Sequence, residues 1–190
     1  METQNINYSD YLGLQNILNA ALPISAEPLE TMFIVAHQTT ELWFKILIQE
    51  LKSVNNVSLD EHPSYSPVIQ LQRVVKIFEH LNTLWNIMTT MTPEDYENFR
   101  GKLGAASGMQ STQYKEVEEL LRKLPKRWNY KYEYHLLDIE NAFKKWQFSH
   151  MKAVERIIGD KSGTGGTSGV GYLKAAVARP LYEIYEWKGW

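Results

Sequence analysis

The stretch PLETMFIVAHQTTELWFKILIQELKSV, residues 28–54, decides the fold class of this chain. Its apolar residues recur at spacings of three and four, the period of one helix face rather than the alternation of a strand. The members of this stripe are Leu29, Phe33, His37, Thr40, Phe44, Leu47 and Leu51. A proline opens the segment, at a position where its missing N–H costs nothing. The stretch therefore predicts a long amphipathic helix with a histidine in the middle of its apolar face.

The same period recurs in two further long segments, residues 66–90 and 132–158. The first stripe consists of Val68, Leu71, Val75, Phe78, Leu81, Trp85 and Met88. The second consists of Leu136, Ile139, Phe143, Trp146, His150, Val154 and Ile157, again with an inward histidine. Shorter helices are expected over residues 8–20, 92–99, 111–124 and 172–178, the second of them opened by Thr92 as N-cap with the acidic Asp95 three residues later. We found no repeat and no linker, so the sequence predicts an all-α fold, a single-domain antiparallel helical bundle over residues 1–190.

Composition narrows the possible functions. The 190 residues are 44% hydrophobic with a net charge of −2, which is typical of a folded globular chain that has no electrostatic attraction for nucleic acid or an anionic membrane. The absence of cysteine excludes disulfides and thiolate chemistry, so any metal must be bound by histidine or carboxylate. Residues 1–10 lack the pattern of a signal peptide, and no apolar run approaches the roughly 18 residues of a membrane span. We therefore expect a cytoplasmic location.

Two of the five histidines are expected to face inward, His37 and His150. His62 and His80 fall on positions expected to be solvated. His135 lies about 22 Å along the helix from His150, too far for both to bind one metal ion. An inward histidine can simply be a core residue with a satisfied hydrogen bond. Alternatively, a neutral imidazole on a bundle helix is suited to be an axial ligand of haem.

The other candidate positions are a glycine-rich segment and an arginine. The segment GTGGTSGVG, residues 163–171, lacks the lysine and the preceding strand of a phosphate-binding loop, so no nucleotide is indicated. It offers close backbone approach and the hydroxyls of Thr164, Thr167 and Ser168 to a ligand, or else it is a flexible connection. Tyr96 and Arg100 are four residues apart in the short helix that is expected to open at Thr92, so their side chains project together. A guanidinium there suits a substrate carboxylate, although it can also be a solvated surface charge.

Together these segments resemble the tryptophan 2,3-dioxygenase family of haem enzymes. The blocks that carry the resemblance are YSDYLGLQNIL, MFIVAHQTTELWFKILIQEL, MTPEDYENFRGKLGAASGMQSTQY and IENAFKKWQFSHMKAVERIIGDKSGTGGTSGVGYL, in family order. HQTTELWFK and GTGGTSGVGYL are the most specific of them. The family usually has a long helical insertion between the elements that here end at Leu124 and begin at Tyr132, so this chain resembles a compact member.

The resemblance implies a set of site residues. His150 matches the axial haem ligand that binds the iron, and Gly165 and Trp85 are expected to contact the haem. His37 matches the catalytic distal histidine, which accepts a hydrogen bond from the indole N–H. The other substrate-binding residues that it implies are Phe33, Tyr96, Arg100, Thr164, Tyr8 and Tyr11. Of these, Arg100 and Thr164 are expected to bind the substrate carboxylate and ammonium groups, and the last two to reach a neighbouring subunit's site.

The activity that the resemblance implies is oxidation of an indole. Haem b and O2 would insert both oxygen atoms across the indole C2–C3 bond of L-tryptophan and form N-formylkynurenine, in a homotetramer or dimer. A related haem mono-oxygenase acting on a modified indole or an aromatic amino acid is one alternative. A non-catalytic haem- or tryptophan-binding protein is another, although binding a gas would not require His37, Arg100 and Thr164 together.

Overall fold

The computed structural model describes residues 6–56, 66–124, 130–159, 161–166 and 168–182, without the side chains of residues 130–132. In this part of the chain every regular element is a helix, as the sequence predicted. The elements are α1 (Tyr8–Leu12), α2 (Leu14–Leu18), α3 (Pro28–Asn55), α4 (Pro67–Met88), α5 (Pro93–Arg100), the 3₁₀ turn η1 (Gly108–Gln110), α6 (Thr112–Lys123), α7 (Tyr130–Ile158) and α8 (Val170–Ala178). None of these helices is both long and apolar enough to cross a membrane.

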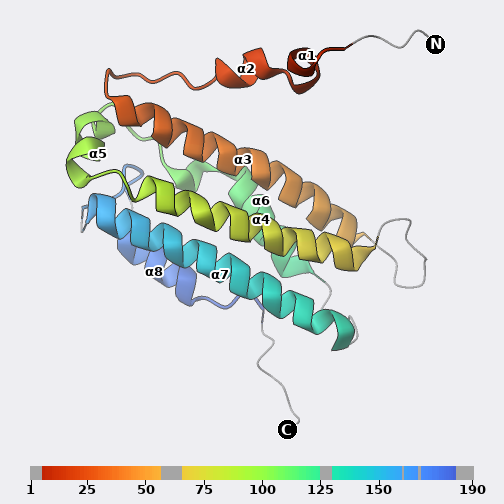
Figure 1. The fold of residues 1–190 in the computed structure, drawn as a ribbon. Coiled ribbons are helices and arrows are strands. Elements are labelled where there is room, and N and C mark those ends of the chain that lie inside the picture. The colour runs from red at the N-terminus through yellow and green to blue at the C-terminus, as the bar shows by residue number, and fades with distance from the viewer. Residues whose placement is uncertain (1–5, 57–65, 125–129, 160, 167, 183–190) are drawn as a thin grey trace.

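Three long helices form the bundle, with α4 packed between α3 and α7 (Figure 1). The short helix α6 packs against α3, and α8 packs against α7. At one end α5 contacts both α3 and α7, so it closes the end of the bundle where α3 begins and α7 ends. The helices α1 and α2 lie along the outer side of α3, apart from the other helices (Figure 1).

The apolar stripes of the three long helices meet in one main core. Its fully buried side chains include Leu47, Leu51, Leu71, Phe78, Leu81, Ile139 and Phe143. A second, smaller cluster lies at the end closed by α5 and consists of Met91, Tyr96, Phe99 and Ile157, with Phe33 packed against it. Two of the expected site residues, Phe33 of α3 and Tyr96 of α5, are in this second cluster.

The helix α5 begins with the N-cap that the sequence predicts at Thr92. Thr92 accepts from the backbone N–H of Asp95, and the Asp95 carboxylate accepts from the backbone N–H of Thr92. This reciprocal cap satisfies two donors that the first turn leaves without helical partners. It fixes the start of α5 so that Tyr96 and Phe99 are buried and Arg100 stands at the end of the helix.

Apart from shifts of one or two residues at helix ends, the structure differs from the expected helices at two places. Residues 8–20 were expected to form one helix, but two short helices flank Gly13, which has a φ of 60°. That left-handed conformation ends α1 and costs a glycine little, since it has no Cβ to clash. The turn η1 was not expected; Ser107 and Gln110 form a capping box that supports it.

Candidate functional site

The histidine of α3 is a neutral hydrogen-bond acceptor. The ring atom Nδ1 of His37 lies 2.7 Å from the backbone oxygen of Phe33, one turn earlier. Because a carbonyl oxygen only accepts, Nδ1 carries the hydrogen and Nε2 keeps its lone pair. Burial lowers the pKa of His37 and outweighs the opposing effects of the Phe33 carbonyl and the Glu41 charge. The ring is therefore uncharged near neutral pH, with Nε2 free to accept a hydrogen bond.

On one side of this imidazole lies Phe33, whose ring packs against two aromatic rings of α5. The ring of Phe33 lies 4.2 Å from that of His37, 5.8 Å from that of Tyr96 and 5.6 Å from that of Phe99, between centroids. Burial raises the pKa of Tyr96, so its phenol stays neutral. The structure thus brings Phe33, His37 and Tyr96 together in surroundings that suit a flat apolar ligand.

The histidine of α7 is a second neutral imidazole. The ring of His150 stacks on that of Trp85 from α4 with a centroid distance of 4.4 Å, and Trp146 lies 6.1 Å away. Burial, followed by the charge of His37, lowers the pKa of His150 from 6.5 to about 4. Within the described part of the chain, neither ring nitrogen of His150 makes a hydrogen bond.

This donor set fits a haem iron. A metal needs the lone pair of a neutral imidazole, and His150 offers one that none of the residues described by the structure occupies. Among the described residues, no three His, Cys, Asp or Glu side chains lie close enough to bind a metal ion together. A porphyrin brings four nitrogen ligands of its own, so a single protein ligand is sufficient.

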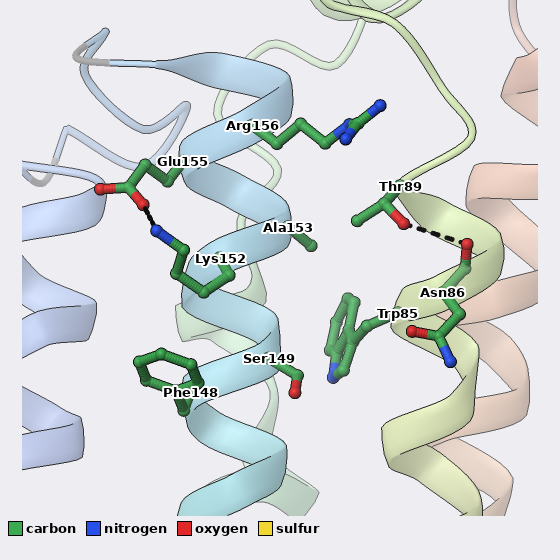
Figure 2. A pocket seen from close by; sticks show the side chains of 9 residues that line it. All are labelled: Trp85, Asn86, Thr89, Phe148, Ser149, Lys152, Ala153, Glu155 and Arg156. Atoms are coloured by element: carbon green, nitrogen blue, oxygen red, sulfur yellow. Dashed lines mark hydrogen bonds and ion pairs between the residues drawn. The ribbon is translucent and has the colours of Figure 1, made fainter.

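Trp85 lies beside both histidines. Trp85 and His37 both line a small cavity of about 10 Å³. The other residues that line this cavity are Ala36, Thr40, Leu84 and Met88. Trp85 also lines a larger, open cavity of about 550 Å³ between α4 and α7, where Figure 2 shows its ring between the two helices. The remaining residues that line this cavity are Asn86, Thr89, Phe148, Ser149, Lys152, Ala153, Glu155 and Arg156. This cavity is not predictable from the apolar stripes, because most of its lining residues lie off them.

The glycine-rich segment lies against the segment that follows α5. Arg100 donates a short hydrogen bond to the carbonyl of Ser162, and the hydroxyl of Thr164 donates to the carbonyl of Ala106 at 2.5 Å. Gly165 approaches Ser107 so closely that a Cβ at residue 165 would lie 2.7 Å from the serine hydroxyl oxygen. The side chain of Arg100 is only 18% exposed. The fold therefore brings Arg100 and Thr164 together, although 64 residues separate them.

Two expected site residues lie away from this cluster. Tyr8 and Tyr11 are in α1, with exposed fractions of 75% and 78%, and neither contacts the other expected site residues. Lys161 belongs to the site region but was not singled out from the sequence; its ammonium group lies 2.7 Å from the carboxylate of Glu97 on α5. The sequence shows only that a lysine precedes the glycine-rich segment. Such a lysine is too common in proteins to predict a contact with Glu97.

These features define a helical bundle with a neutral histidine on each of two helices and an arginine–tyrosine pair closing one end. The family described as Tryptophan 2,3-dioxygenase matches residues 1–135 and 124–186. A tryptophan 2,3-dioxygenase of Bradyrhizobium sp. (strain ORS 278) is 33% identical, with 93% of this chain and 89% of the relative covered. The enzyme of the same name from Polaromonas sp. (strain JS666 / ATCC BAA-500) is 34% identical, with 97% of this chain and 87% of the relative covered. The one from Ralstonia pickettii (strain 12J) is 31% identical, with 90% of this chain and 88% of the relative covered. The chain belongs to the tryptophan 2,3-dioxygenase family, and it is an enzyme of the oxidoreductase class.

The comparisons also show that the chain is a compact family member. The alignment with the Bradyrhizobium relative extends over 252 positions, more than the 190 residues of this chain, so the relative has residues that face a gap here. The two stretches matched by the family meet at residues 124–135. This is where the sequence analysis expected the family's insertion to be missing.

Proposed function

We propose that this chain is a haem-dependent dioxygenase that inserts both atoms of O2 across the indole C2–C3 bond of L-tryptophan and forms N-formylkynurenine. The observation that carries the proposal is the pair of neutral imidazoles, His37 and His150, on two helices of a chain that belongs to this family. When bound through His150, haem b supplies the redox-active iron that allows O2 to react with an organic molecule.

In this proposal His37 orients the indole. Its Nε2 accepts the indole N–H because Nδ1 is already bonded to the carbonyl of Phe33. Since that carbonyl belongs to the same helix, the imidazole is held in one tautomer and one orientation before the substrate arrives. The rings of Phe33 and Tyr96 form the apolar wall against which the indole packs. Such pre-orientation can contribute several kcal/mol to lowering a reaction barrier.

Arg100 and Thr164 bind the charged end of the amino acid. The guanidinium of Arg100 stands at the end of α5, next to the buried Tyr96, and can form two parallel bonds with a carboxylate. The hydroxyl of Thr164 reaches the same region because the glycine-rich segment lies against Ala106. Together they fix the side of the substrate opposite to the indole.

The exposed N-terminal helices support an oligomer in which Tyr8 and Tyr11 complete a neighbouring subunit's site. Besides the two tyrosines, other apolar side chains of α2 and of the segment after it are exposed, including Ile17, Leu18 and Leu22. Exposing this apolar surface to water is unfavourable, so it is suited to burial against a second copy of the chain. A homotetramer or dimer is expected by light scattering after size exclusion, and a chain lacking residues 1–24 should shift toward the monomer. A monomeric full-length protein would contradict this part of the proposal.

The reaction is tested with isotopically labelled oxygen. The purified chain loaded with haem, given L-tryptophan and ¹⁸O2, should release a product that carries two labelled atoms by mass spectrometry. A single labelled atom would indicate a mono-oxygenase, and tight tryptophan binding without any oxidation would indicate a binding protein. Either result would overturn the dioxygenase assignment.

Two variants separate the roles of the histidines. His150→Ala should purify without the Soret absorption of bound haem, whereas His37→Ala should keep it. His37→Ala should instead bind L-tryptophan more weakly and turn it over more slowly, because the indole N–H loses its acceptor. Haem retained at full occupancy in His150→Ala would rule out its role as the iron ligand.

A further inference from the structure

Arg100 has an acidic neighbour that competes with its proposed ligand. Glu97 precedes it by three residues on α5, and the two side chains lie 3.7 Å apart between Nη1 and Oε2. The pKa of Glu97 is lowered, first by a hydrogen bond from Lys161 and also by the charges of Lys161 and Arg100, so this carboxylate is ionised. A substrate carboxylate at Arg100 would therefore meet a negative charge next to its binding partner.

Lys161 holds this carboxylate. Its Nζ lies 2.7 Å from the same Oε2 atom of Glu97 that is 3.7 Å from Arg100. The longer of the two distances is that of an ion pair but lies beyond an ordinary hydrogen bond, so Glu97 accepts its hydrogen bond from Lys161 and stays in a looser ion pair with the arginine on its own helix. Without the lysine, residues 97 and 100 have the i,i+3 spacing at which opposite charges on a helix pair directly.

We propose that Lys161 is a positioning residue that keeps Arg100 available to a substrate carboxylate by pairing with Glu97. The inference rests on the proposed function, because it takes Arg100 as the group that binds the carboxylate. The bond from Arg100 to the carbonyl of Ser162 does not conflict with it, since a guanidinium has five N–H donors and a backbone carbonyl carries no net charge. Lys161 thus offsets a nearby negative charge as well as tethering the loop.

The exposure of the Glu97 and Lys161 side chains limits how much their pairing can change L-tryptophan affinity. The side chains of Glu97 and Lys161 are 53% and 58% exposed, so water and salt screen their charges, whereas Arg100 is 18% exposed. Exposed ion pairs of this kind change an equilibrium by about two- to fivefold. We expect Lys161→Met to weaken L-tryptophan binding by that factor, and the loss to shrink at high salt.

A double-variant cycle distinguishes charge competition from simple tethering. Calorimetry would measure L-tryptophan binding to the haem-loaded chain and to the variants Lys161→Met, Glu97→Gln and the combination of the two. If Lys161 acts by occupying Glu97, Glu97→Gln binds at least as tightly as the parent chain, and adding it to Lys161→Met restores the lost affinity. If the pair only tethers the loop, both single variants are weakened and the combination is not restored, which would overturn the proposal. An unchanged affinity in Lys161→Met would overturn it as well.

Two controls separate this inference from the function on which it rests. Lys102→Met removes an exposed positive charge from the same region without touching Glu97 and should leave the affinity unchanged; a loss equal to that of Lys161→Met would refute the specific pairing. If Arg100→Lys leaves L-tryptophan binding unchanged, the carboxylate assignment itself fails. If Arg100→Lys weakens binding but Glu97→Gln does not rescue Lys161→Met, only the present inference fails.

Discussion

Replacing Gly165 by alanine should disrupt the junction that brings Arg100 and Thr164 together. The added Cβ would lie 2.7 Å from the Oγ and 2.8 Å from the Cβ of Ser107, whereas carbon atoms pack at about 3.5 to 4 Å. Rotating the serine side chain moves its Oγ but not its Cβ, so one of the two backbone segments has to shift. Overpacking of this kind costs about 1–3 kcal/mol.

The cost should appear in ligand affinity rather than in global stability. The junction is at the exposed end of the bundle, so the glycine-rich segment can move away while the main core stays packed. That movement weakens the bonds from Arg100 to Ser162 and from Thr164 to Ala106. The expected result is an L-tryptophan dissociation constant raised roughly 5- to 150-fold by calorimetry, with a melting temperature close to that of the parent chain.

Two further variants make the reasoning refutable. Combining Gly165→Ala with Ser107→Gly removes both clashing atoms and should restore most of the affinity. Gly108→Ala adds a methyl group to the same segment where nothing lies within 4 Å, so it should have little effect. Unchanged binding in Gly165→Ala, or no recovery in the combined variant, would show that the close approach to Ser107 does not hold the loop in place.

Three further predictions concern the ligand, the core and pH. Arg100→Lys should bind L-tryptophan more weakly by calorimetry, since a point charge cannot copy two parallel bonds to a carboxylate; equal affinity would exclude Arg100 as the carboxylate ligand. Phe78→Ala removes a fully buried ring and should lower the free energy of unfolding by about 3–5 kcal/mol in urea, while a loss below 1 kcal/mol would contradict its place in the core. In the haem-free chain the pKa of His150 is about 4 against 6.5 for a free imidazole, so the unfolded state binds more protons between these values and stability falls as pH drops from 6.5 to 4. His150→Phe should reduce that slope by up to about 1.4 kcal/mol per pH unit in urea titrations, and an identical slope would refute the buried neutral state.

Most of the fold could be read from local patterns. The helix expected over residues 28–54 is α3, which ends one residue later, and the cap at Thr92 starts α5 as expected. These predictions succeed because the spacing of apolar residues, the position of proline and the capping residues all act between residues that are close together in the sequence. The break at Gly13 was missed because the apolar spacing continues across it, while the backbone turns there into a left-handed conformation.

The site was predicted only in its components. The stripes placed His37 and His150 on inward faces, but their tautomer and charge depend on burial and on the carbonyl of Phe33. The stacking of Trp85 on His150 joins two helices whose relative rotation no local pattern specifies. Likewise, the contact between Lys161 and Glu97 joins residues 64 positions apart.

By itself the sequence determined the all-helical fold, the long helices that carry His37 and His150, and the family, since these follow from short-range periodicity and from the residue blocks. Only the tertiary structure decided that the glycine-rich segment lies against the segment that follows α5, that Glu97 accepts its hydrogen bond from Lys161 rather than from Arg100, and that both histidines are neutral. The physical reason is that hydrogen bonding, charge pairing and desolvation depend on distances in space. Packing sets those distances, and spacing along the chain does not encode them.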